Sequence, residues 1–118
     1  MSVLVLTDDL IFSAKIEAAA RQSGVVICLV ANPNQVNQAL REKTFRRAII
    51  DLNSSGDTAI GSVRTIHEQF PQLPILGYCP HVQVELQKQA LAAGCSQVVA
   101  RSVFVRQLPD LLSGKPAA

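Results

Sequence analysis

The sequence predicts an α/β fold in which five parallel strands form one sheet with helices on both faces. Short continuous apolar runs alternate with longer segments whose apolar residues recur three and four positions apart. The runs are rich in Val, Ile and Leu without polar alternation, which is typical of parallel strands buried on both faces. With 118 residues, 48% hydrophobic and 17% charged, the chain suits one globular domain rather than a disordered segment.

Five apolar runs are predicted strands, and the five segments that follow them are predicted helices. We expect strands at Val3 to Leu6, Val25 to Ala31, Ala48 to Leu52, Pro74 to Cys79 and Gln97 to Ala100. We expect helices at about Ile11 to Gln22, Asn34 to Lys43, Asp57 to Phe70, Val82 to Ala93 and Val103 to Leu112. Such alternation indicates repeated strand-helix-strand units, whose crossovers are right-handed.

Glycines, prolines and one asparagine support these boundaries. Gly24 and Gly94 follow the first and fourth helices, as residues that end helices do. Asn32 before Pro33 is typical of a helix N-cap with proline in the first turn. Pro109 lies inside the last helical segment and must kink it or begin a shorter helix, so we expect an irregular end to the fold.

Composition excludes several classes of protein. The formal net charge of +2 comes from scattered basic residues, so we expect no nucleic-acid partner. Cys28, Cys79 and Cys95 lack metal-ligand spacing, which suits a reducing cytosol. No apolar run reaches the roughly 18 residues of a membrane span, and no signal peptide begins the chain. We expect a cytoplasmic domain at 1–113 and, at 114–118, a flexible tail or the start of a linker.

Carboxylates close two of the predicted strands. Asp8 and Asp9 follow the first strand, and Asp51 lies in the third. A doubly wound sheet of five such units most simply has the strand order 2-1-3-4-5, which makes these strands neighbours. The three side chains then converge where the strand order reverses, and clustered carboxylates with open positions suit magnesium.

These residues resemble the receiver domain of two-component response regulators from Val3 to Leu112, which implies a flavodoxin-like fold. The resemblance implies that Asp51 is the phosphoacceptor for a histidine kinase and that magnesium is held by acids after the first strand. The Leu73-Pro74 pair before the fourth strand lies at the family's distance from Asp51. By the same resemblance, Asp8 and Asp51 are metal ligands, with the backbone carbonyl of Asn53.

The sequence departs from the family's pattern at several site positions. Thr7 stands in place of the first acid unless Asp9 substitutes through a one-residue slip, so we expect at most weak magnesium binding. Three switch positions also differ: the hydroxyl of the fourth strand, the aromatic residue of the fifth strand and the lysine at its end have become Cys79, Val98 and Arg101. A thiol is a weak donor, and arginine replaces a point charge with a planar fork.

Structural roles without chemistry compete with these assignments. Asp51 alone could be a turn cap, and Asp9 favours a helix N-cap. Cys79 is more readily a small packed residue, with a pKa that neighbouring carboxylates raise, than a reactive thiol. Other polar residues are expected to face solvent, and they are His67, His81, Arg41, Lys43, Arg46 and Arg47. Phe104 suits the core or a partner contact.

Two functions of different class follow from the resemblance. In the first, the domain is a pseudo-receiver that binds another protein or dimerises through the fourth helix, fifth strand and fifth helix. In the second, Asp51 still takes a phosphoryl group from a histidine kinase with magnesium. Neither is an enzyme beyond phosphorylation and dephosphorylation at Asp51, and a small-molecule binder on the same fold is a third option. A downstream effector would then be the partner, or would continue the chain past Ala118.

Overall fold

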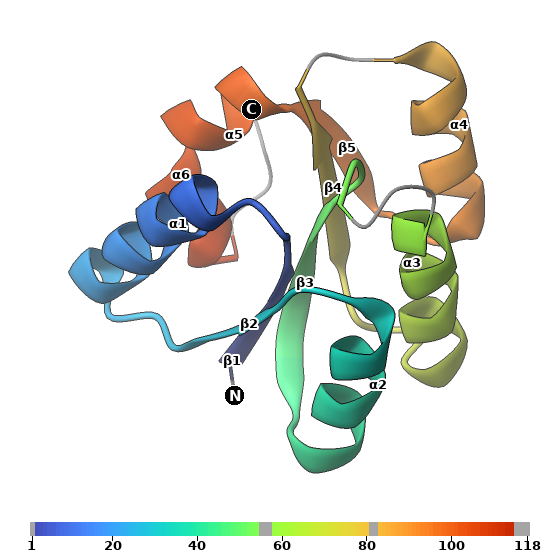
Figure 1. Cartoon of the computed structure of the whole chain (residues 1–118), viewed down its shortest axis with the longest axis horizontal. Helices are drawn as coiled ribbons and strands as arrows, with labels where there is room; N and C mark the ends of the chain where they lie inside the picture. The colour runs from blue at the N-terminus through green and yellow to red at the C-terminus, as the bar shows by residue number, and fades with distance from the viewer. Residues whose placement is uncertain (1, 55–57, 81–82, 115–118) are drawn as a thin grey trace.

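A computed structural model describes residues 2–54, 58–80 and 83–114, and it contains one five-stranded parallel sheet (Figure 1). The strands are β1 (Ser2–Leu6), β2 (Ile27–Val30), β3 (Phe45–Asp51), β4 (Ile75–Cys79) and β5 (Gln97–Ala100). Their order is β2-β1-β3-β4-β5, and every neighbouring pair is parallel. The predicted flavodoxin-like topology is confirmed.

Helices cover both faces of this sheet (Figure 1). They are α1 (Leu10–Ser23), α2 (Pro33–Glu42), α3 (Thr58–Gln69), α4 (Val84–Ala93), α5 (Arg101–Arg106) and α6 (Leu108–Leu112). One apolar cluster joins α1, α5 and α6 to the sheet, and a second joins α2, α3 and α4 to the opposite face. None of the described helices is long and apolar enough to span a membrane. The doubly wound arrangement brings the carboxyl ends of all five strands to one edge.

Helix caps confirm the predicted punctuation. Asp9 is the N-cap of α1, and its Oδ1 accepts a hydrogen bond from Phe12 N at 3.0 Å. Asn32 caps α2 in the same way. Gly24 ends α1 with φ of 69°, a left-handed conformation that favours glycine. A side-chain oxygen at an N-cap accepts from a backbone N–H that has no partner within the helix, so both caps set where their helices begin.

The fifth helix differs from the prediction in its first residue and in its continuity. It begins at Arg101, directly after β5, rather than at Val103, and it ends at Arg106. A separate short helix, α6, follows with Pro109 in its first turn, where a missing N–H costs no hydrogen bond. The expected irregular end is therefore confirmed, and of the two expected outcomes at Pro109 the structure shows the shorter helix, not a kink.

The prediction that Arg46 and Arg47 face solvent is confirmed for Arg46, which is exposed, and is wrong for Arg47, which is buried. Arg46 Nη2 donates to the carbonyl oxygen of Leu112 at 3.1 Å, and Arg47 Nη1 donates to that of Leu111. Arg47 is only 8% exposed. Because the last carbonyls of a helix lack intrahelical partners, the two arginines tie the C-terminal end of α6 to β3.

The predicted exposure or burial of single residues can be compared with the structure at His67 and Phe104, while other predictions fall on residues that the structure does not describe. His67 is exposed, as expected, and Phe104 is fully buried, which supports its core role and contradicts its role as a partner contact. His81, the expected helix starts Asp57 and Val82, and the tail residues 115–118 fall outside the described residues.

We predict that Gly94→Ala destabilises the fold. Gly94 has φ of 136°, and a Cβ at this position would lie 2.5 Å from Cβ and Cγ of His67. We expect a loss of about 1–3 kcal/mol in the free energy of unfolding, measured by urea denaturation. Gly61→Ala is the matched control, because nothing lies within 4 Å of a Cβ there and Gly61 is helical; it should stabilise by about 0.5–1 kcal/mol. Equal stability of the Gly94→Ala variant and the wild type would contradict the clash.

Candidate functional site

A buried carboxylate lies where β1 and β3 end side by side. Asp51, the last residue of β3, is 3% exposed. Its Oδ2 accepts a hydrogen bond from Thr7 Oγ1 at 3.0 Å, and its Oδ1 accepts one from Asn53 N at 3.1 Å. The Thr7 hydroxyl in turn accepts from Asp9 N at 3.2 Å. Leu6 of β1 pairs with Ile50 of β3 in parallel register. This pairing brings the next residue of each segment, Thr7 and Asp51, to the same edge of the sheet.

Burial raises the pKa of Asp51 above the usual value for an aspartate, and this effect outweighs the groups that lower it. The hydrogen bonds from Asn53 N and Thr7, in that order, and then the charge of Arg101 lower the pKa. The charge of Asp8 raises it, so these two carboxylates sense each other as the sequence predicted. Burial therefore disfavours the ionised form of Asp51, and two hydrogen-bond donors and a nearby cation partly offset this effect.

Arg101 is the first residue of α5 and directly follows β5, at the position where a cation was expected from the sequence. Its Nη2 lies 3.7 Å from Asp9 Oδ2, and its guanidinium carbon lies 4.9 Å from the centre of the Phe12 ring. Arg101 and Asp9 are each 36% exposed, so solvent screens this pair and it contributes little to stability. Together, Asp9 and Phe12 position the guanidinium close enough to Asp51 to lower the pKa of that carboxyl.

An aromatic cluster that the sequence analysis missed supports this arrangement. The rings of Tyr78 and Phe104 stack with centroids 4.5 Å apart, and Phe12 packs against both. Tyr78 pairs in register with Asp51, and its buried hydroxyl has no hydrogen-bond partner among the described residues. Burial raises the pKa of this hydroxyl, and the charge of Asp51 raises it further. The sequence offered one clue to the role of Tyr78, because this residue immediately precedes Cys79, an expected switch position.

Two of the three expected switch positions pack on the opposite face of the sheet. Cys79 is fully buried in the apolar cluster beneath α2, α3 and α4, and Val98 packs against the same cluster. Burial raises the pKa of the Cys79 thiol, with a smaller contribution from Asp51. The prediction of a small packed residue is confirmed, although burial, not the neighbouring carboxylate, is the main cause of the raised pKa.

The predicted metal ligands lie around Asp51 with different surroundings. The Asp8 and Asn53 side chains are exposed, while the Asp9 carboxylate caps α1 and faces Arg101. Within residues 2–54, 58–80 and 83–114, no group of three or more His, Cys, Asp and Glu side chains is arranged to hold a metal ion.

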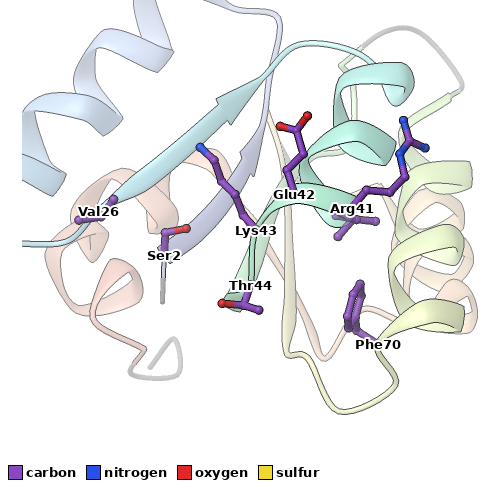
Figure 2. A pocket seen from close by; sticks show the side chains of 8 residues that line it. Ser2, Val26, Arg41, Glu42, Lys43, Thr44 and Phe70 are labelled. Carbon is purple, nitrogen blue, oxygen red and sulfur yellow. The ribbon is translucent and has the colours of Figure 1, made fainter.

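A separate hollow lies at the other end of the sheet, where β1 and β3 begin (Figure 2). It has a volume of about 680 Å³, and its lining includes Arg41, Glu42, Lys43 and the half-exposed Phe70. Figure 2 shows the charged side chains of Lys43 and Glu42 extending from the same segment. Because charges of both signs share this lining, its electrostatics do not select one kind of ligand.

We predict that Thr7→Val raises the pKa of Asp51 further and destabilises the fold by about 1–3 kcal/mol at neutral pH. The variant keeps the side-chain shape but removes the donor to Asp51 Oδ2. Because the folded-state pKa is raised, protonation of Asp51 relieves the penalty, so the loss should shrink as the pH falls through that pKa. Urea denaturation across the acidic range measures this.

Thr7→Ser is the matched control, because it retains the hydroxyl and should stay close to the wild type in its pH dependence. A loss in Thr7→Val that does not change with pH would show that the hydroxyl has no role in holding the Asp51 charge.

Comparison with solved structures shows proteins with the same fold as this chain. No family model matches the sequence. A CheY-like response regulator receiver domain protein from Methanospirillum hungatei superposes with a TM-score of 0.84 at 15% identity, covering 95% of this chain and 90% of that one. A response regulator from Thermotoga maritima gives 0.81 at 18% identity, covering 95% and 93%.

A response regulator protein from Burkholderia pseudomallei, with a phosphorylated aspartic acid, calcium ion and citrate, gives a TM-score of 0.83 at 17% identity, covering 94% of this chain and 65% of that one. The chain therefore has the CheY-like fold of response regulator receiver domains.

Proposed function

We propose that this chain is an atypical receiver domain in two-component signalling whose phosphorylation switch is degenerate, and that it acts mainly through protein contact or dimerisation. The observation that carries this proposal is the hydrogen bond from the Thr7 hydroxyl to Asp51 Oδ2. In the family that the chain resembles, an acid occupies the position of Thr7. A neutral donor here satisfies Asp51 without a cation, whereas a second carboxylate would require one.

Magnesium binding by this site would be weak. The groups that would hold the ion are the carboxylates of Asp8 and Asp51 and the backbone carbonyl of Asn53. Asp9 is a poorer candidate because its two oxygens face the α1 N-terminus and Arg101. The bound ion would supply positive charge beside Asp51, but the affinity of such a site falls as the number of anionic ligands falls.

The residues at the switch positions also support a degenerate switch. Cys79 is a weak donor, and it is buried in the apolar cluster on the α2–α4 face. Val98 has no ring that exchanges between buried and exposed positions. Arg101 is already in contact with Asp9 and Phe12, so its use by a phosphoryl group on Asp51 would compete with these contacts.

The alternative function is a working phosphoacceptor. The position of Asp51 at the end of β3 and the nearby positive charge of Arg101 favour it. In that reaction a carboxylate oxygen of Asp51 forms the bond to phosphorus while the bond from phosphorus to a kinase histidine breaks, and the imidazole keeps the electron pair. Asp8 with magnesium and Arg101 would offset the charge on the transferred group.

Exposed apolar side chains support the proposed contact surface on α4, β5 and α5. Val84 and Leu91 lie seven residues apart on α4, on the same helical face, with 61% and 44% of their surface exposed. Val105 of α5 is 41% exposed. These residues would form the apolar part of an interface with a second copy or another protein.

For the phosphorylation switch, we predict that the purified domain gains no Asp51-dependent phosphoryl group when it is incubated with magnesium and a small phosphodonor. Intact mass measurement checks this, with Asp51→Asn as the matched control. A phosphoryl adduct in the wild type that is absent from Asp51→Asn would establish the alternative function instead.

The triple variant Thr7→Asp, Cys79→Thr and Arg101→Lys should bind magnesium more tightly than the wild type, because it regains a carboxylate ligand.

For the contact surface, we predict a self-association that Leu91→Asp weakens, because a charge in an apolar interface is costly to bury. Sedimentation velocity over a range of protein concentrations measures the change. Ile11→Asp is the matched control, since Ile11 is 79% exposed on α1 and lies outside the proposed surface. A chain that stays monomeric at every concentration would exclude the homodimer and leave a different protein as the partner.

A further inference from the structure

Arg47 is a buried cation without an acidic partner in the part of the chain that the structure describes. It lies near the start of β3 and is 8% exposed. Its Nη1 donates to the carbonyl oxygen of Leu111, while its Nε is buried without a hydrogen-bond partner among the described residues. Among the described residues, the ion pair between a basic and an acidic side chain joins Arg101 to Asp9 and does not involve Arg47.

The surroundings of Arg47 only partly offset this charge. The C-terminal end of α6 presents carbonyl oxygens, whose partial negative charge favours a cation. Arg46, the preceding residue of β3, adds a second positive charge, and burial together with this neighbouring charge lowers the pKa of Arg47. A buried charge without a full counter-charge is unfavourable, and an anion at the site would reduce this penalty.

A cavity adjoins this guanidinium. It has a volume of about 430 Å³, and its lining includes Arg47, Ser96, Gln97 and Gly114. The Ser96 hydroxyl accepts a hydrogen bond from Ile75 N at 3.3 Å, so its own proton remains available to a ligand. None of the described residues that line the cavity is acidic. Among the described residues, the cavity thus combines a buried cation with neutral polar groups and no acidic side chain.

We propose that this cavity binds a small oxyanion, a phosphate or a carboxylate, with Arg47 as its charged ligand. A guanidinium presents paired N–H donors that match the oxygens of such groups, and one Arg47 donor is unused among the described contacts. The site lies at the amino end of the sheet, whereas Asp51 lies at the carboxyl end. It is therefore independent of the proposed phosphorylation chemistry.

The test is an NMR titration of the full chain with inorganic phosphate at constant ionic strength and neutral pH. We expect a saturable shift of the Arg47 Nε–Hε signal together with the backbone amide signals of Ser96 and Gln97. Arg47→Met should weaken phosphate binding at least about tenfold, or about 1.4 kcal/mol. Arg46→Met is the matched control, because Arg46 is adjacent in sequence but does not line this cavity, and its affinity should stay near that of the wild type.

Two further variants keep the test decisive. If Arg47→Met does not fold, Arg47→Lys retains the charge without the planar fork and should bind phosphate more weakly than the wild type. Asp51→Asn should bind phosphate as the wild type does, since the two sites are separate. The absence of a saturable Arg47 shift in the wild type, or an unchanged affinity in the variants of Arg47, would overturn the proposal.

A parallel titration with acetate distinguishes the sources of the anion. Tighter binding of phosphate than of acetate supports a free phosphate or phosphate ester as the ligand. Tighter binding of acetate supports a carboxylate, such as the side chain of an acidic peptide. Binding of neither anion contradicts the oxyanion site.

Discussion

The buried carboxylate of Asp51 is the constraint on which the carboxyl edge of the sheet depends. Two strands buried on both faces end together there, so the carboxylate is removed from water and must be satisfied by local donors. Thr7 and Asn53 N supply those donors, and Arg101 supplies positive charge from the start of α5. Because burial still raises the pKa, any ligand that neutralises Asp51 would be favoured at this edge.

The groups that a receiver switch would have to couple lie on opposite faces of the sheet. Tyr78 packs with Phe12 and Phe104 on the α1, α5 and α6 face. Cys79 and Val98 pack on the α2, α3 and α4 face. Alternation along a strand causes this division, since consecutive residues point to opposite faces. The stacked aromatic rings fill part of the first face, while the cluster on the second face consists mainly of aliphatic side chains.

Arginines at the two ends of the sheet solve different problems of charge. Arg101 is partly exposed and lies between a carboxylate and an aromatic ring, so water and its neighbours share its stabilisation. Arg47 is buried and relies on the last carbonyls of α6, which it shares with Arg46. The same contacts hold the short C-terminal helix against β3. The guanidinium of Arg47 attaches α6 to β3 and still has one unused donor, Nε. The same side chain therefore contributes to the stability of the fold and to the proposed oxyanion site.

The sequence alone determined the five strands and the Asp9 and Asn32 caps, because apolar periodicity and capping chemistry are local. The strand order followed from the doubly wound arrangement of five strand-helix units. The sequence also placed Asp8, Asp51 and Arg101 at one edge, since strand order determines which strand ends meet. Only the tertiary structure decided that Thr7 bonds to Asp51, that Tyr78 lies beside them and that Arg46 and Arg47 hold α6. These contacts join residues far apart in the chain, and burial, which no local pattern specifies, decides their energies.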